Sequence, residues 1–291
     1  MIANGTDIGS FIPTINFKVG NSRLLDFIKT AQADLAEKVL GSTIESELEQ
    51  PIDDSEIDRH AELRTMVKRA IYLSAFFDSI PELDLQLSEA GFVVASNSAV
   101  SPASRERVGA LMQRVSERRS DAVDKLHRFL IENSKDDGSK YAEWRSSTQF
   151  AHLGSGFVLS LGEFNDCFVA NDDSSKAVLW DDFYRLIPRM NDALYGEIAQ
   201  YVSSDYITEL LEKKFDSESI LSLERSVSFK ISCAVVAAAT GNTGVMRTQA
   251  VRARNIMVDN ISLFPTFRAS SSYVLPRMEI GSRDDAVVNM L

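Results

Sequence analysis

The sequence predicts a mainly α-helical protein: a helical bundle with a small extended element and a long irregular C-terminal tail. Apolar residues recur at intervals of three and four over several long segments, which is the pattern of amphipathic helices. Apolar residues make up 44% of the 291-residue chain. Such a composition can bury a core without a metal, a cofactor or a cross-link. We expect an N-terminal helical region over residues 1–140, a C-terminal helical region over 141–262 and an extended tail over 263–291.

The N-terminal region begins with two expected helices. The first runs from Ser22, as N-cap, to Gly41, because the apolar residues between them have a helical period and glycine suits a helix C-terminus. The second is expected to start near residues 54–55 and to reach about Phe77. Pro81 then marks its end, since proline interrupts the helical hydrogen-bond ladder.

An extended element and a long helix follow. Gly91–Asn97 has β-branched and aromatic residues between turn formers, which predicts a short strand or extended segment. Ser101 is the expected N-cap of a long amphipathic helix over residues 102–133, with Pro102 in its first turn. The polar residues 134–140 form the expected linker to the second region.

The C-terminal region is less regular at its start. Glycines interrupt Phe150–Asp173, so we expect loops with short pieces of structure there. The helical period resumes over Trp180–Ile198, and a short helix is expected over Asp205–Lys213. Ser217 is the expected cap of another helix, and a last helix is expected over Val245–Ser262.

The two regions share a pattern of apolar positions. Residues 24–39 align with residues 183–198, and residues 63–71 align with residues 223–231. Two explanations stay open. Either the chain consists of two related helical halves, or amphipathic helices of similar length align by chance.

No residue pattern indicates catalysis, a metal site or a nucleotide site. The histidines His60, His127 and His152 are isolated in sequence, and Cys167 and Cys233 lie in apolar surroundings typical of buried thiols. We therefore expect no enzyme and no cofactor.

The charge and hydropathy of the chain restrict its surroundings. The net charge of −11 opposes sequence-independent binding to DNA or to an anionic membrane. The arginine-rich stretch Arg105–Arg119 is a local exception, which we interpret as a solvated helix face. The longest apolar run, Cys233–Ala239, is shorter than the roughly 20 residues of a bilayer span. We expect the protein to fold in the cytoplasm of the cell that makes it.

The expected tail is rich in apolar side chains that follow neither a helical nor an alternating period. These side chains either pack on the chain's own helices or dock on a neighbouring subunit. In the second case, a chain cut after Ser262 would stay folded but would not assemble. The candidate assembly contacts are Phe264, Phe267, Tyr273, Leu275, Met278 and Ile280.

Four stretches of the chain carry a family resemblance. They are Phe27–Gln32, Leu83–Leu85, Gly91–Asn97 and Val100–Val108. With these stretches the chain resembles an uncharacterised protein family of Bacteroidetes phages and prophages, most strongly over Asp84–Val108. The resemblance carries over no catalytic residue.

The resemblance implies a virion structural protein of the head-tail connector or adaptor kind. Its copies would form a homo-oligomeric ring at the portal vertex, in contact with the portal and other head-tail proteins. DNA would pass through the lumen without sequence recognition, and no membrane would be involved. The protein would reside in the virion, and in the host cytoplasm during assembly. The alternatives are a cytoplasmic helical protein-interaction module and an enzyme with a cryptic site near Cys167.

Overall fold

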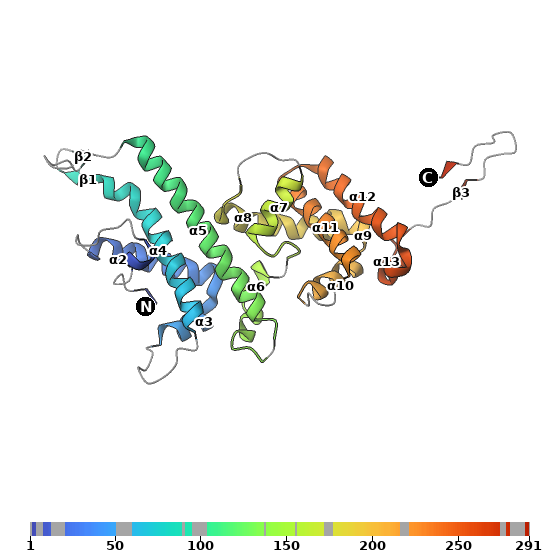
Figure 1. Cartoon of the computed structure of the whole chain (residues 1–291), viewed down its shortest axis with the longest axis horizontal. Coiled ribbons are helices and arrows are strands. Elements are labelled where there is room, and N and C mark those ends of the chain that lie inside the picture. The colour runs from blue at the N-terminus through green and yellow to red at the C-terminus, as the bar shows by residue number, and fades with distance from the viewer. Residues whose placement is uncertain are drawn as a thin grey trace. The chain divides into compact units, whose positions relative to one another are not determined.

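The computed structural model is mainly α-helical, as the sequence predicts (Figure 1). None of its described helices combines the length and the hydropathy needed to cross a membrane. The structure describes residues 2–3, 8–12, 21–50, 60–88, 91–94, 104–136, 138–154, 156–171, 177–215, 221–273, 278–279 and 289–290.

The chain divides into two compact units. The first comprises Met1–Asn165 and Ser175–Ile187, and the second comprises Asp166–Ser174 and Pro188–Leu291. This division differs from the break that we expect at residue 140. Trp144 accounts for part of the difference, because it is buried in the first unit and its indole Nε1 donates a hydrogen bond of 2.8 Å to the carbonyl of Val39.

The first unit consists of helices and one small hairpin. The elements up to its border with the second unit are α1 (Ile8–Phe11), α2 (Asn21–Leu35), the π-helix η1 (Ala36–Leu40), α3 (Gly41–Glu49), α4 (Ala61–Asp84), β1 (Leu85–Ser88), β2 (Gly91–Val94), α5 (Arg105–Asn133), the 3₁₀-helix η2 (Ala142–Ser146), α6 (Thr148–Leu153) and α7 (Leu161–Ala170). The core lies where α4 packs against α2 and α5. The predicted apolar stripes of these helices are buried: Ile28, Val67 and Leu126 are each at most 1% exposed.

Several predicted helix ends are wrong. Ser22 lies inside α2, whose described part already begins at Asn21. Helix α4 continues past Phe77 to Asp84 with Pro81 inside it, because a proline in the last turn removes only one helical hydrogen bond. The described part of α4 begins at Ala61, so the expected start near residues 54–55 lies outside the described residues.

The long helix α5 begins three residues later than expected. Its N-cap is Ser104, whose hydroxyl accepts a hydrogen bond of 3.4 Å from the backbone N–H of Arg107. Ser101 and Pro102 lie outside the described residues. Ahead of this helix, β1 and β2 pair as an antiparallel hairpin in which Leu85 lies opposite Val94. The hairpin contains the first part of the extended segment that we expect from residue 91.

The second unit is built around a helical hairpin of α11 (Ser222–Ala239) and α12 (Thr243–Asp259), whose facing sides are buried. Gly241, with a φ of 84°, allows the turn between them. The predicted cap of α11, Ser217, lies outside the described residues. At the start of this helix the Glu224 carboxylate accepts a 2.9 Å hydrogen bond from the N–H of Leu221.

The remaining elements complete the described chain. They are α8 (Trp180–Ala193), the π-helix η3 (Leu194–Ile198), α9 (Ala199–Val202), α10 (Ser204–Phe215), the 3₁₀-helix η4 (Ile261–Leu263), α13 (Pro265–Ala269), β3 (Met278–Glu279) and β4 (Asn289–Met290). Helix α8 begins in the first unit and ends in the second.

The two aligned helical stretches have the same irregularity. A π-helix follows α2 at Ala36–Leu40 and follows α8 at Leu194–Ile198. Shortly after each π-helix the backbone adopts a positive φ, 77° at Gly41 and 73° at Ser203. The π-helices are 158 residues apart and the positive-φ residues 162 apart, so neither repeats the 159-residue offset of the aligned stretches, and both explanations of the alignment stay open.

The start of the expected tail belongs to the core of the second unit. Residues 265–269 form the short helix α13, and Phe264 and Phe267 are at most 1% exposed. The Phe264 ring lies edge-on to Tyr206 of α10, with 5.7 Å between the centroids. The segment that we expect to be extended from residue 263 is therefore helical in this portion, because one helical turn is enough to direct both phenylalanines inward.

Candidate functional site

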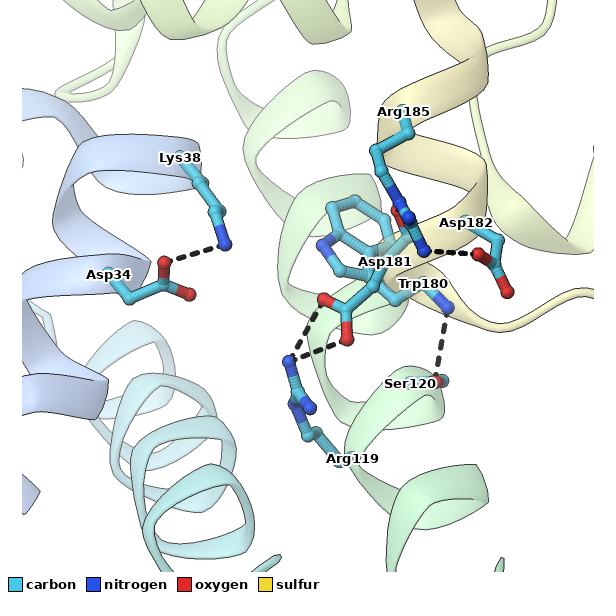
Figure 2. A network of polar contacts seen from close by, with 8 residues as sticks. All are labelled: Asp34, Lys38, Arg119, Ser120, Trp180, Asp181, Asp182 and Arg185. Carbon is cyan, nitrogen blue, oxygen red and sulfur yellow. Dashed lines mark hydrogen bonds and ion pairs between the residues drawn. The ribbon is translucent and has the colours of Figure 1, made fainter. Parts of the chain in front are cut away.

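A polar network joins the first turn of α8 to helix α5 within the first unit (Figure 2). The backbone N–H of Trp180 donates a hydrogen bond of 3.1 Å to the Ser120 hydroxyl. Arg119 Nη2 donates to both carboxylate oxygens of Asp181, each at 2.9 Å. Asp181 lies in the first turn of α8, where the helix dipole also favours a carboxylate. These contacts fix the chain around residues 177–181 along α5.

A groove lies beside this network, between α4, α5 and the segment before α8. Its volume is about 570 Å³, which is within the usual range for ligand pockets. The walls are apolar, and an amide, a hydroxyl and a carboxylate lie among them. The described residues that line it are Phe77, Met112, Gln113, Ser116, Glu117, Ala177 and Leu179.

The groove lies toward the exposed N-terminal end of α5. Val108, Leu111 and Met112, which the sequence predicts on the buried stripe of this helix, are half-buried or exposed, and Leu111 is 36% exposed. The first buried residue of α5 is Val115. The beginning of the long helix therefore presents apolar side chains to solvent next to an open groove.

The charges of the polar network do not balance. Asp34 and Lys38 of the α2–η1 segment form an ion pair of 2.6 Å, and Asp78 of α4 lies in the field of this pair and of Arg119 with Asp181. Partial burial raises the pKa of Asp78 above its ordinary value, and the charge of Arg119 opposes this rise. With Asp181 and the Asp182–Arg185 pair, the described residues of the network hold four carboxylates and three cations.

The groove offers polar groups as well as an apolar surface. Ser116 and Glu117 lie in the groove, so its described lining holds a hydroxyl and a carboxylate that could act as a base. The groove can accept an apolar side chain, with hydrogen bonds available at its edge from Gln113 and Ser116.

His127 is a core residue of the first unit. It is fully buried between Trp144 and Trp180, with ring centroids 6.3 Å and 5.5 Å away. Neither ring nitrogen has a hydrogen-bond partner among the described residues, and burial lowers the pKa of His127 to about 3. The imidazole is therefore neutral and packs as an aromatic ring.

His60 and His152 have different neighbours from His127. His60 is 3.9 Å from a carboxylate oxygen of Glu47 and packs against the ring of Tyr141. The ring of His152 lies 4.5 Å from that of Tyr184. Each histidine thus has its own surroundings, and they form no common site.

The two cysteines are buried thiols. Cys167 and Cys233 are both buried and form no disulfide. In the part of the chain that the structure describes, no group of three His, Cys, Asp or Glu side chains could hold a metal ion.

Three of the predicted assembly contacts are covered by the chain itself. Phe264 and Phe267 are buried. Tyr273 is half-buried, with its ring 5.7 Å from that of Phe267. These three residues therefore do not form an exposed docking surface.

The other predicted contacts lie beyond Tyr273. Leu275 and Ile280 lie outside the described residues. The backbone of Met278 is in β3, which pairs with β4. Their part in assembly stays a prediction.

Sequence reasoning missed the groove. Asp181 was identifiable as an acidic residue at a helix start, and Arg119 as part of a basic stretch. Their pairing joins residues 62 positions apart, and no local pattern signals such a contact.

One family model matches part of the first unit. Residues 21–153 match the model of a family of unknown function (DUF6712). This range begins with α2, ends with α6 and contains Asp84–Val108, the strongest portion of the phage-family resemblance. No curated protein and no solved structure matches the chain. Over α2 to α6, the chain is thus similar to a family that has no assigned function.

Proposed function

We propose that the chain is a virion structural protein, a head-tail connector whose copies form a ring at the portal vertex. The resemblance of Asp84–Val108 to a phage and prophage family supports this role. In the ring, the chain would contact neighbouring copies, the portal and other head-tail proteins, and DNA would pass through without sequence recognition.

The observation that carries the proposal is the groove at the exposed end of α5. Its walls include Phe77, Met112 and Leu179, and its volume of about 570 Å³ can hold one or two apolar side chains. Apolar pockets with a polar rim are typical of the centres of protein interfaces. The groove thus supports an assembly protein over an enzyme.

The net charge of −11 fits a conduit for DNA. Each phosphate that a protein neutralises adds affinity through counterion release, and tight binding would slow the passage of DNA. An acidic chain avoids this affinity.

The proposal is tested by mass photometry of the purified chain, with and without purified portal protein. We expect either a closed ring of the chain alone or multiple copies bound to each portal. Met112→Glu should abolish the assembly, because a carboxylate in the groove would oppose an apolar side chain. Ala110→Glu is the matched control, since residue 110 is exposed on the same helix and does not line the groove.

A chain that stays monomeric and does not bind portal would refute the proposal. Circular dichroism melting of both variants tests whether they remain folded. Assembly of Met112→Glu at the wild-type level would leave the connector role in place but would remove the groove from it.

A further inference from the structure

Helix α12 presents a basic face on the second unit. Its exposed side carries Arg247, Val251 and Arg252, with Arg254 half-buried at the edge. Four residues of the opposite side are each at most 2% exposed: Met246, Ala250, Ala253 and Met257. In a chain with a net charge of −11, α12 holds three arginines and a single acidic residue, Asp259, at its C-terminal end.

The arginines of this face have no carboxylate partner among the described residues. Arg247, Arg252 and Arg254 form no ion pair with any residue that the structure describes. Val251, between them, is 40% exposed. Contact with another molecule would give the guanidinium groups charged partners. It would also bury the exposed valine side chain.

A second face of the same unit exposes two carboxylates, with Arg189 exposed one turn before the first of them. The π-helix η3 exposes three consecutive residues, and its Tyr195 is 51% exposed. Glu197 lies two residues further on, and Asp192 is exposed nearly one turn earlier. Neither carboxylate forms an ion pair within the described part of the chain. π-helical turns are frequent at functional sites, and here the turn places a tyrosine between two acids along the chain.

We propose that the α12 face of one copy docks on the η3 face of the next copy. The arginines would pair with Asp192 and Glu197, and one guanidinium would stack on the Tyr195 ring. Val251 would be buried in the interface. Because the two faces differ, the contact is head-to-tail and can close into a ring. The inference rests on the proposed connector function, since it names the contact between neighbouring copies.

Duplex DNA is the competing partner for an arginine face. An exposed valine at the centre of the face gains nothing from a phosphate backbone, and the net charge of the chain opposes DNA binding. The acidic face has no role in binding DNA, whereas a second copy uses both faces. The observations therefore favour a second copy.

The test is a charge-reversal experiment, read by mass photometry of the full chain alone and with portal. One variant carries Arg247→Glu, Arg252→Glu and Arg254→Glu, and the other carries Asp192→Lys and Glu197→Lys. We expect each variant alone to raise the dissociation constant of the copy-to-copy contact by at least about 10-fold. An equal mixture of the two should recover assembly, because each then meets a complementary face.

Two single variants control for charge alone. Arg268→Glu and Glu212→Lys change exposed residues of the same unit outside both faces, and both should assemble like the wild type. Circular dichroism melting checks that each variant is folded. The wild type should also assemble less well at high salt, because exposed charges are screened.

The outcomes separate this inference from the connector proposal. If the wild type assembles and both reversed variants assemble equally well, the contact is wrong while the connector function stands. If the wild type stays monomeric alone and with portal, the connector proposal fails and the contact fails with it. If the arginine variant assembles normally but loses retention of duplex DNA, the α12 face binds nucleic acid and the inference is overturned.

Discussion

Arg119 and Asp181 form a two-point contact that joins the middle of α5 to the first turn of α8. One guanidinium nitrogen lies 2.9 Å from each carboxylate oxygen, and the guanidinium carbon lies 5.5 Å from the centroid of the Phe77 ring. The Arg119 side chain is 15% exposed and that of Asp181 is 48% exposed. The pair therefore holds a wall of the groove in place at a partly desolvated site.

We predict that Arg119→Met lowers the free energy of unfolding by about 1–2 kcal/mol, since a charged hydrogen bond and a packed guanidinium are lost. Urea denaturation followed by circular dichroism measures this change. The matched control is Arg185→Met, which breaks the exposed ion pair with Asp182 and should cost less than about 0.5 kcal/mol. Equal losses for the two variants would contradict the structural role of Arg119.

His127 predicts an acid-sensitive first unit. Burial lowers its folded-state pKa to about 3, below the ordinary value of 6.5 that holds in the unfolded chain, so the folded state disfavours protonation. The resulting stability is fully present above pH about 6.5 and is lost as the pH falls toward about 3. Between pH about 7 and pH about 4.5, the wild type should lose about 2–3 kcal/mol more than His127→Leu does.

The measurement for His127 is urea denaturation of both proteins across this pH range. Other groups titrate in both chains, so the difference between them isolates His127. Parallel pH profiles for the wild type and His127→Leu would show that the imidazole can be protonated in the folded state.

Two of the positive-φ positions, Gly41 and Ser203, predict opposite effects of substitution. Gly41 has a φ of 77° and a ψ of 162°, a region used almost only by glycine, and an added Cβ would lie 2.8 Å from Oε1 of Gln149. Gly41→Ala should therefore destabilise the protein by about 1–3 kcal/mol.

Ser203 has a φ of 73° with a side chain present, so Ser203→Gly should stabilise the protein by about 1 kcal/mol. Differential scanning calorimetry of both variants tests the pair, and a lower Tm for Ser203→Gly would show that the serine side chain offsets its backbone strain.

The buried start of the expected tail predicts where the chain can be cut. Removing residues after Ser262 deletes Phe264 and Phe267, which fill the core of the second unit, and should unfold that unit. The single change Phe267→Ala should already cost about 3–5 kcal/mol. A chain cut after Tyr273 keeps both side chains and should melt like the full-length protein. Limited proteolysis and circular dichroism distinguish the two truncations, and a folded, protease-resistant chain ending at Ser262 would restore the docking interpretation of this segment.

The helical period of the apolar residues was sufficient to predict much of the fold. The apolar stripes of α2, α4 and α11 are buried where their period places them, because a helix fixes which residues share a face. Gly41 follows its helical segment as predicted, since few residues other than glycine adopt its backbone conformation.

The sequence by itself therefore determined the fold class and the main buried faces, since both depend on residues near one another in the chain. Only the tertiary structure decided that Pro81 stays inside α4, that Phe264 and Phe267 turn inward, and that Arg119 meets Asp181 beside a groove. These outcomes depend on which distant surfaces a helix packs against. The same holds for exposure: α5 is amphipathic along its length, but its N-terminal stripe reaches solvent because the described part of the chain does not cover it there.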